Sequence, residues 1–203
     1  MELVSIETLL IVIVLPFTTL LGVILKSAWD RFSIYKIKRK EETRTKKLNY
    51  LENKINNFYL PLYVHLQRDK YLWELVKQVI CKKYEIIACD DPCNDDLFVE
   101  KFKTILCSGD DNLLIQIEKS ILSNHLKCLE IIDKNSILAE PVQYLIELLS
   151  QYAKHVVIYD YLRQDGIYEF PKNYGARYPS YLLKVIETKL FELENQYNKM
   201  LGV

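Results

Sequence analysis

The hydrophobic and polar positions divide the chain into two contrasting parts. Residues 8–25 form a run of 18 residues without a charged side chain. A helix of this length is roughly 27 Å long, close to the ~30 Å hydrocarbon thickness of a bilayer. From residue 48 onward, the apolar residues instead recur every three or four positions, as in amphipathic helices around a core. The pattern predicts one membrane-spanning helix followed by a helical domain.

A signal peptide and a buried core helix are both less favoured for the apolar run than a membrane span. A signal peptide begins with a basic region and ends at a cleavage site with small residues. Here the run is preceded by Glu2 and Glu7, and it is followed by Lys26 without such a site. A buried core helix of this apolarity would ordinarily belong to a larger domain than the one that follows. Pro16 and Gly22 agree with a span, because both residue types are frequent in membrane helices.

The charges that flank the run predict its orientation. Residues 26–47 contain nine Lys and Arg against three acidic residues, whereas residues 1–7 contain no Lys or Arg. Basic flanks remain in the cytoplasm, so residues 1–7 should form a short extracytoplasmic terminus in the inner (cell) membrane. The domain after the span should be cytoplasmic. An odd number of cysteines, five, also suits a reducing compartment.

Residues just after the span are candidates for contact with lipid headgroups. Trp29 falls on the cytoplasmic side at headgroup depth, as in an aromatic belt. Lys36, Lys38, Arg39 and Lys40 form a basic cluster that should fix the topology. The same cluster can contact anionic headgroups, and the two roles are compatible.

Helix-breaking and helix-capping residues predict how the rest of the chain is organised. A basic juxtamembrane helix is expected over residues 26–60, because Pro61 should kink or break it. Residues 61–203 are expected to form a cytosolic helical bundle, since the chain has only five glycines and no strand–turn–strand pattern. The fold class is therefore all-α.

Three later helices have recognisable ends. Ser108, Asp110 and Asp111 can cap a helix that runs to about residue 133. Pro141 falls near the first turn of the next helix, which should run to about residue 163. The last helix follows an irregular connector over residues 166–180.

Two apolar seams have the three–four spacing of coiled coils. Their residues are Leu48, Leu51, Ile55 and Phe58 in the first seam, and Leu183, Ile186, Leu190 and Leu193 in the second. Each seam can pack inside its own chain or against a second copy. We expect the second seam to belong to the bundle. The first should join chains, because a helix near the membrane has few other neighbours. A homo-oligomer is therefore expected.

The sequence contains no recognisable catalytic constellation. It lacks the nucleophile-elbow, phosphate-loop and metalloprotease motifs, and its three histidines, at positions 65, 125 and 155, are far apart. His65 and Asp69 lie one helical turn apart, which is common on the surface of an amphipathic helix. We expect no enzymatic activity, and a hydrolase with an unrecognised site is only a third alternative.

Cysteine and histidine spacing raises the question of a metal site. Cys89, Cys93, His125 and Cys128 could together supply a Cys₃His zinc site. Structural zinc sites normally use more closely paired ligands. We therefore expect ordinary thiols and a surface histidine, with no metal and no other cofactor.

The charge balance argues against nucleic acid as a partner. Residues 48–203 contain 18 basic and 22 acidic residues. Such a domain has no positive field that would collect phosphates. The expected partners are the lipid bilayer and further copies of the chain.

One stretch, NNFYLPLYVHLQRDKYLW at residues 56–73, carries a resemblance to a known class of proteins. An apolar span, a basic linker and the motif FY-x-PLY-x-x-L resemble small single-span proteins of bacterial anti-phage defence loci. These are membrane-anchored helical effectors that permeabilise the inner membrane during infection. The resemblance covers roughly the first 75 residues and carries over no functional residues.

The resemblance implies an effector that a partner or an assembly state holds inactive. The leading hypothesis is a membrane-anchored, non-catalytic effector or sensor that acts by self-association and membrane perturbation. The alternative is a passive membrane anchor or scaffold that recruits a cytosolic protein partner.

Overall fold

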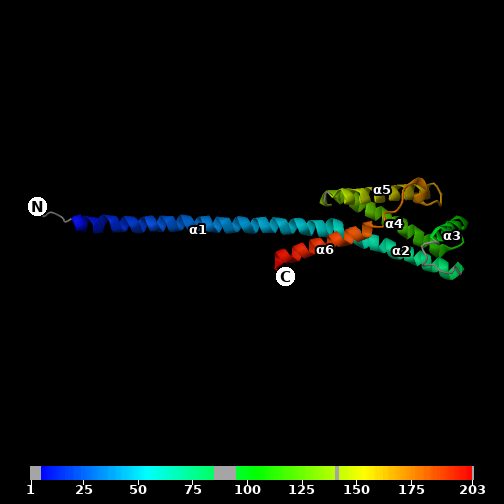
Figure 1. Ribbon diagram of the computed structural model, residues 1–203, viewed down its shortest axis with the longest axis horizontal. Helices are drawn as coiled ribbons and strands as arrows, with labels where there is room; N and C mark the ends of the chain where they lie inside the picture. The colour runs from blue at the N-terminus through cyan, green and yellow to red at the C-terminus, as the bar shows by residue number, and fades with distance from the viewer. Residues whose placement is uncertain (1–5, 85–94, 140–141, 203) are drawn as a thin grey trace. The chain divides into compact units, whose positions relative to one another are not determined.

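A computed structural model (Figure 1) describes residues 6–84, 95–139 and 142–202, with side chains for 21–84, 98–139 and 142–202. Every regular element in these residues is helical, and they contain no strand. The predicted all-α class is confirmed. The chain divides into two compact units, residues 1–49 and 50–203. Each unit is described on its own below.

The first unit is helical throughout its described residues. Helix α1 spans Ile6–Lys54 and also supplies the first residues of the second unit. Within the part of the chain that the structure describes, no helix has both the length and the apolarity needed to cross a membrane. The side chains of residues 8–20, which make up most of the expected span at 8–25, lie outside that part.

The junction between α1 and α2 differs from the break expected at Pro61. A π-helical turn, Ile55–Tyr59, joins α1 to α2, which spans Leu60–Tyr84. Leu60 keeps right-handed helical angles, with φ −66° and ψ −49°. Proline is tolerated in the first turn of a helical segment, where its missing N–H is not needed. The π turn interrupts the α-helical hydrogen-bond pattern just before Pro61 and so gives α2 such a start. The chain therefore stays helical through this point.

Four further α-helices complete the second unit. They are α3 (Asp95–Ser108), α4 (Asn112–Asn135), α5 (Gln143–Gln164) and α6 (Leu182–Leu201). Two short 3₁₀ turns, Ser136–Leu138 and Pro171–Tyr174, lie in the connections. Helices α4, α5 and α6 agree with the three helices expected from the sequence.

The core of the second unit consists of two hydrophobic clusters, and both α2 and α4 contribute to each of them. The first cluster combines the π turn and the first half of α2 with the second half of α4, the first half of α5, and α6. The second cluster combines the second half of α2 with α3, the first half of α4, and Tyr159 on α5. Leu62, Leu66, Val76 and Ile80 are fully buried. Together these residues form the buried apolar stripe of α2.

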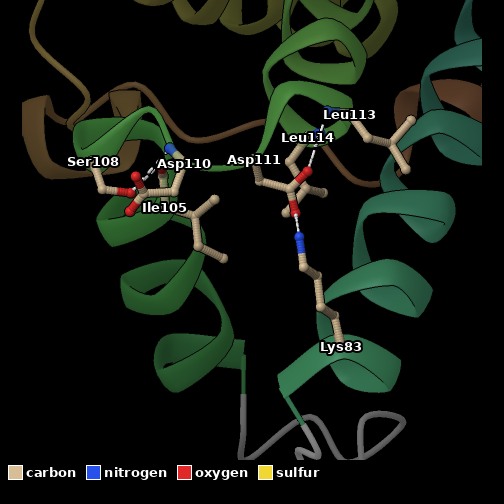
Figure 2. A network of polar contacts seen from close by, with 7 residues as sticks. All are labelled: Lys83, Ile105, Ser108, Asp110, Asp111, Leu113 and Leu114. Carbon is tan, nitrogen blue, oxygen red and sulfur yellow. Dashed lines mark hydrogen bonds and ion pairs between the residues drawn. The ribbon is translucent and has the colours of Figure 1, made fainter.

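The turn between α3 and α4 is fixed by the side chain of Asp111. Its Oδ1 accepts hydrogen bonds from the N–H groups of Leu113, at 3.1 Å, and Leu114, at 3.3 Å. The Nζ of Lys83, near the end of α2, lies 2.7 Å from its Oδ2 (Figure 2). The bond from Lys83 and the bonds from the two N–H groups lower the pKa of the Asp111 carboxyl. Asp111 is thus the N-cap of α4 and also ties α2 to it.

The Asp111→Ala substitution should remove the cap and leave Lys83 without this partner. We expect a loss of roughly 1 to 2 kcal/mol in the free energy of unfolding, most of it from the cap, since Lys83 is half exposed. Urea unfolding of the full-length protein, followed by circular dichroism, measures the loss. Asp110→Ala is the matched control and should leave the midpoint unchanged. Equal losses in the two variants would show that the cap contributes nothing specific.

Candidate functional site

Seven of the eight residues of the two predicted seams lie together in the second unit. The buried members are Leu51, Ile55, Phe58, Ile186, Leu190 and Leu193. All six belong to the same hydrophobic cluster, against which Leu183 packs. Leu48 is half-buried and lies in the first unit. The sequence predicts that the first seam joins chains. This prediction is wrong for its buried members, because they find their neighbours in the same chain.

The residues expected at the membrane surface lie on α1. Trp29, Lys36, Lys38, Arg39 and Lys40 are all exposed. The ring of Trp29 lies near that of Phe32, with 6.4 Å between the ring centroids. Their contact with lipid headgroups stays a prediction.

A buried polar cluster in the second unit was not expected from the sequence. Its central residues are Asp69 on α2, Asn124 and His125 on α4, and Tyr152 on α5. Each of these residues is at most 5% exposed. A buried carboxylate is stable only when hydrogen-bond donors surround it, so the contacts of Asp69 decide what the cluster does.

The polar cluster lies where the two hydrophobic clusters meet. On α2, Asp69 stands between Leu66 of the first hydrophobic cluster and Val76 of the second. On α4, Asn124 and His125 occupy the equivalent place between the two. The polar residues thus form a layer across the middle of the unit.

The Asp69 carboxylate accepts hydrogen bonds from two other helices. Its Oδ1 accepts from Asn124 Nδ2 at 2.6 Å, and its Oδ2 accepts from the Tyr152 hydroxyl at 3.2 Å. His125 Nδ1 lies 3.0 Å from the same Oδ2 and 2.8 Å from the Tyr152 oxygen. Asn124 also contacts His65, through the ring Nδ1 and the backbone carbonyl, at 2.6 Å each. The cluster therefore links α2, α4 and α5.

His155 and Tyr178 extend the cluster toward the connector between α5 and α6. The ring of His155 lies 5.6 Å from that of His125 and 5.5 Å from that of Tyr178, measured between centroids. Its Nδ1 donates a hydrogen bond to the carbonyl oxygen of Ala176 at 2.9 Å. Burial lowers the pKa of His155 to about 4. The imidazole is therefore neutral at pH 7.

The chemistry of the neighbouring side chains favours a structural role. Burial raises the pKa of the Cys128 thiol to about 12, so the nucleophilic thiolate is not formed at neutral pH. Burial also raises the pKa of Tyr152. The polar atoms of the cluster bond to one another, and two depressions of the surface are lined by other residues, along α2 and between the π turn and α6. Such a layer fixes how the three helices align.

A buried ion pair joins the first third of α4 to the end of α5. Arg163 Nε donates to Glu118 Oε1, and the Tyr159 hydroxyl donates to the same oxygen at 3.0 Å. Arg163 Nη1 also donates to the backbone carbonyls of Ile167 and Glu169, at 2.7 Å and 2.9 Å. This contact holds the start of the connector against α5.

The residues considered for a zinc site are not brought together among the described residues. Cys89 and Cys93 lie outside the part of the chain that the structure describes. Within that part, no three His, Cys, Asp or Glu side chains form a group that could hold a metal ion. His125 and Cys128 instead belong to the buried surroundings of Asp69.

The cysteines differ in their bonding. Cys81 is disulfide-bonded, whereas Cys107 and Cys128 are free thiols. Disulfides persist mainly in oxidising compartments. The cysteines therefore do not support the expected cytoplasmic location. The remaining argument for it is the distribution of charges around the expected span.

The spacing of residues along the sequence indicates the positions of the polar cluster. Asp69 continues the three–four spacing of the apolar stripe on α2, and Asn124 and His125 do the same on α4. A polar residue at a core position requires a polar partner. The spacing identifies these positions as buried, although it does not say which of them meet.

Comparison with known proteins adds no relative. No protein-family model matches the chain, and neither a curated protein nor a solved structure is significantly similar to it.

Glutamate substitutions test the placement of the two seams. We expect Leu51→Glu and Leu190→Glu each to lower the free energy of unfolding by about 3 to 5 kcal/mol, because each buries an unpaired carboxylate in the core. The exposed neighbour Phe191 provides the control, Phe191→Glu, which should stay folded. Thermal unfolding followed by circular dichroism distinguishes the three variants. A folded Leu51→Glu protein that has lost only its association would place the first seam between chains.

The low pKa of His155 predicts a dependence of stability on pH. In the unfolded chain this histidine takes up a proton near pH 6.5, whereas in the folded chain it does so only near pH 4. The free energy of unfolding should therefore fall as the pH falls from about 6.5 to about 4, by roughly 2 to 3 kcal/mol in all. Urea unfolding at several pH values should show this slope, and it should be shallower in His155→Gln. Identical slopes in the two proteins would assign the effect to other groups.

Proposed function

We propose that the chain is a single-pass, non-catalytic membrane protein whose helical unit self-associates, and that it acts as an effector or sensor that perturbs the bilayer. The observation that carries the proposal is an apolar surface on α1. Leu21, Val23, Ile24 and Leu25 are 53–66% exposed. At 100° per residue, these four side chains point to different sides of the helix. A helix that is apolar all round belongs either in a core or in a membrane.

The residues on both sides of this surface support a location in the membrane. The uncharged run begins at residue 8 and ends at Leu25, directly before the basic stretch at 26–47. The exposed aromatic residues Trp29, Phe32 and Tyr35 follow within a few turns, as they do at a membrane interface. The basic stretch favours an orientation with the amino terminus outside the cell membrane and the helical unit in the cytoplasm.

The buried polar cluster and the exposed surface of the helical unit favour a protein that acts by association over one that acts as an enzyme. The polar groups around Asp69 are hydrogen-bonded to one another and are not turned toward a substrate cavity. The surface of the unit has exposed apolar and aromatic side chains, among them Val64, Tyr71, Val157 and Tyr161. Contiguous exposed apolar groups usually mark a surface that binds a protein or a membrane. The resemblance of residues 56–73 to defence effectors points to the same class, with a role against phage.

Controlled expression in bacteria tests the effector function. The full-length protein should collapse the membrane potential, read with a potential-sensitive dye, because clustered spans perturb the bilayer. The matched control is Ile13→Lys with Val14→Lys, which places two charges in the middle of the uncharged run and should prevent insertion at equal expression. An unchanged potential with the inserted wild-type protein would contradict the effector function and favour a passive anchor.

Reporter fusions expressed in the same cells test the membrane orientation of the chain. A reporter that is active only in the cytoplasm, fused after Val203, should be active, and a reporter that requires export should be silent. The reverse pattern would place the helical unit outside, where the disulfide of Cys81 is ordinary.

A further inference from the structure

We propose that the chains associate head to tail, with the outer face of α2 in one copy packed on the outer face of α5 in the next. The proposal rests on the self-association proposed above and assigns the two surfaces that make the contact. The argument starts from the faces of these helices that their own core leaves uncovered.

The outer stripe of α2 consists of Leu60, Val64, Arg68, Tyr71 and Leu75. Their spacing places them on one face of the helix, opposite the buried face that carries the core residues. All five are exposed. Members of the stripe also line a surface depression of about 430 Å³. A mainly apolar surface of this kind requires a partner.

Arg68 is the only charged residue in this stripe. Among the residues that the structure describes, it forms no ion pair. A second α2 stripe would therefore be a poor partner. Antiparallel packing that matches Leu60 with Leu75 and Val64 with Tyr71 brings the two Arg68 side chains together, and so does parallel packing in register. Like charges in an interface cost affinity. The stripe needs an apolar partner that carries a carboxylate.

The outer stripe of α5 has this chemistry. It consists of Ile146, Ser150, Ala153, Val157 and Tyr161, with the half-buried Asp160 at one edge. The exposed Lys154 lies at the other edge, where its Nζ donates a hydrogen bond to the carbonyl oxygen of Gly175 at 3.0 Å. Ile146, Val157 and Tyr161 are exposed large side chains, whereas Ser150 and Ala153 are small and allow a second helix to approach closely. Asp160 Oδ2 accepts a hydrogen bond from Gln164 Nε2 at 2.7 Å. In the described part of the chain, Asp160 pairs with no cation.

The two stripes match in size and in charge. In a parallel arrangement, Arg68 comes level with Asp160 and Tyr161 when Val64 is level with Val157. Leu60 then comes level with Ala153, so that a large side chain faces a small one. The spacing agrees over these three positions, since 60, 64 and 68 are separated like 153, 157 and 161. Tyr71 then comes level with Gln164, the last residue of α5, and Leu75 lies beyond it. The occupant of the α2 stripe is therefore a second copy of this chain, bound through α5.

The position of the stripes makes the contact repeatable. Helix α4 packs against both α2 and α5 and lies between them within the unit (Figure 1). Each outer stripe lies opposite the buried face of its helix, so the two stripes face away from each other. A contact between different surfaces of identical chains generates a ring or a filament. At the membrane, such an assembly would bring many spans together.

Charge reversal tests this contact in the full-length protein, solubilised in detergent, with mass measured by light scattering. We expect the wild-type protein to form oligomers. Arg68→Asp and Asp160→Arg should each weaken association by about tenfold or more, because each places two like charges in the contact. The double variant should recover the wild-type mass. Lys70→Asp, an exposed charge change off the stripe of α2, is the matched control and should behave as wild type.

Mixing the two single variants sharpens the test. An equimolar mixture of Arg68→Asp and Asp160→Arg chains should assemble, because every contact in an alternating array then pairs opposite charges. If Asp160→Arg alone behaves as wild type, or if neither the double variant nor the mixture recovers, the α2–α5 contact is overturned while self-association stands. If the wild-type chain is monomeric in detergent and in cross-linked membranes, both this contact and the proposed self-association fail.

Discussion

The second unit depends on how one buried carboxylate, that of Asp69, is compensated. A buried charge without donors costs several kcal/mol, which is a large share of the stability of a small domain. Asn124 and His125 on α4 and Tyr152 on α5 supply the contacts. A shift of either helix by one residue would leave the carboxylate uncompensated. The polar layer thus fixes the alignment of helices whose apolar contacts alone would tolerate several alignments.

The two units meet different solvation requirements. The second unit buries one face of each helix in its own core, so each helix needs only an apolar stripe. On α1, residues 21–25 are apolar on several sides and remain exposed. Water is a poor solvent for such a surface, and a bilayer is a good one. The proposed division into an anchor and an associating module follows from this difference.

The core also limits which surfaces can join chains. Both coiled-coil-like seams are used inside the second unit, where Ile55 and Phe58 share a cluster with Ile186 and Leu190. The apolar surfaces that the core leaves uncovered are less regular than the seams. Arg68 interrupts the apolar stripe on α2, and small residues interrupt the apolar stripe on α5. Surfaces of this kind suit selective contacts, since the charge rejects the wrong partner as much as it attracts the right one.

The sequence by itself determined what depends on neighbouring residues. The all-α class, the buried stripe on α2 and the Asp111 cap all follow from spacing and local hydrogen bonding. Only the tertiary structure decided which buried positions meet. Asp69, His125 and His155 lie far apart along the chain. The apolar spacing of a seam is the same whether its partner is a helix of the same chain or of another. Pairing between distant segments is chosen by the packing of the whole core, and no local pattern records it.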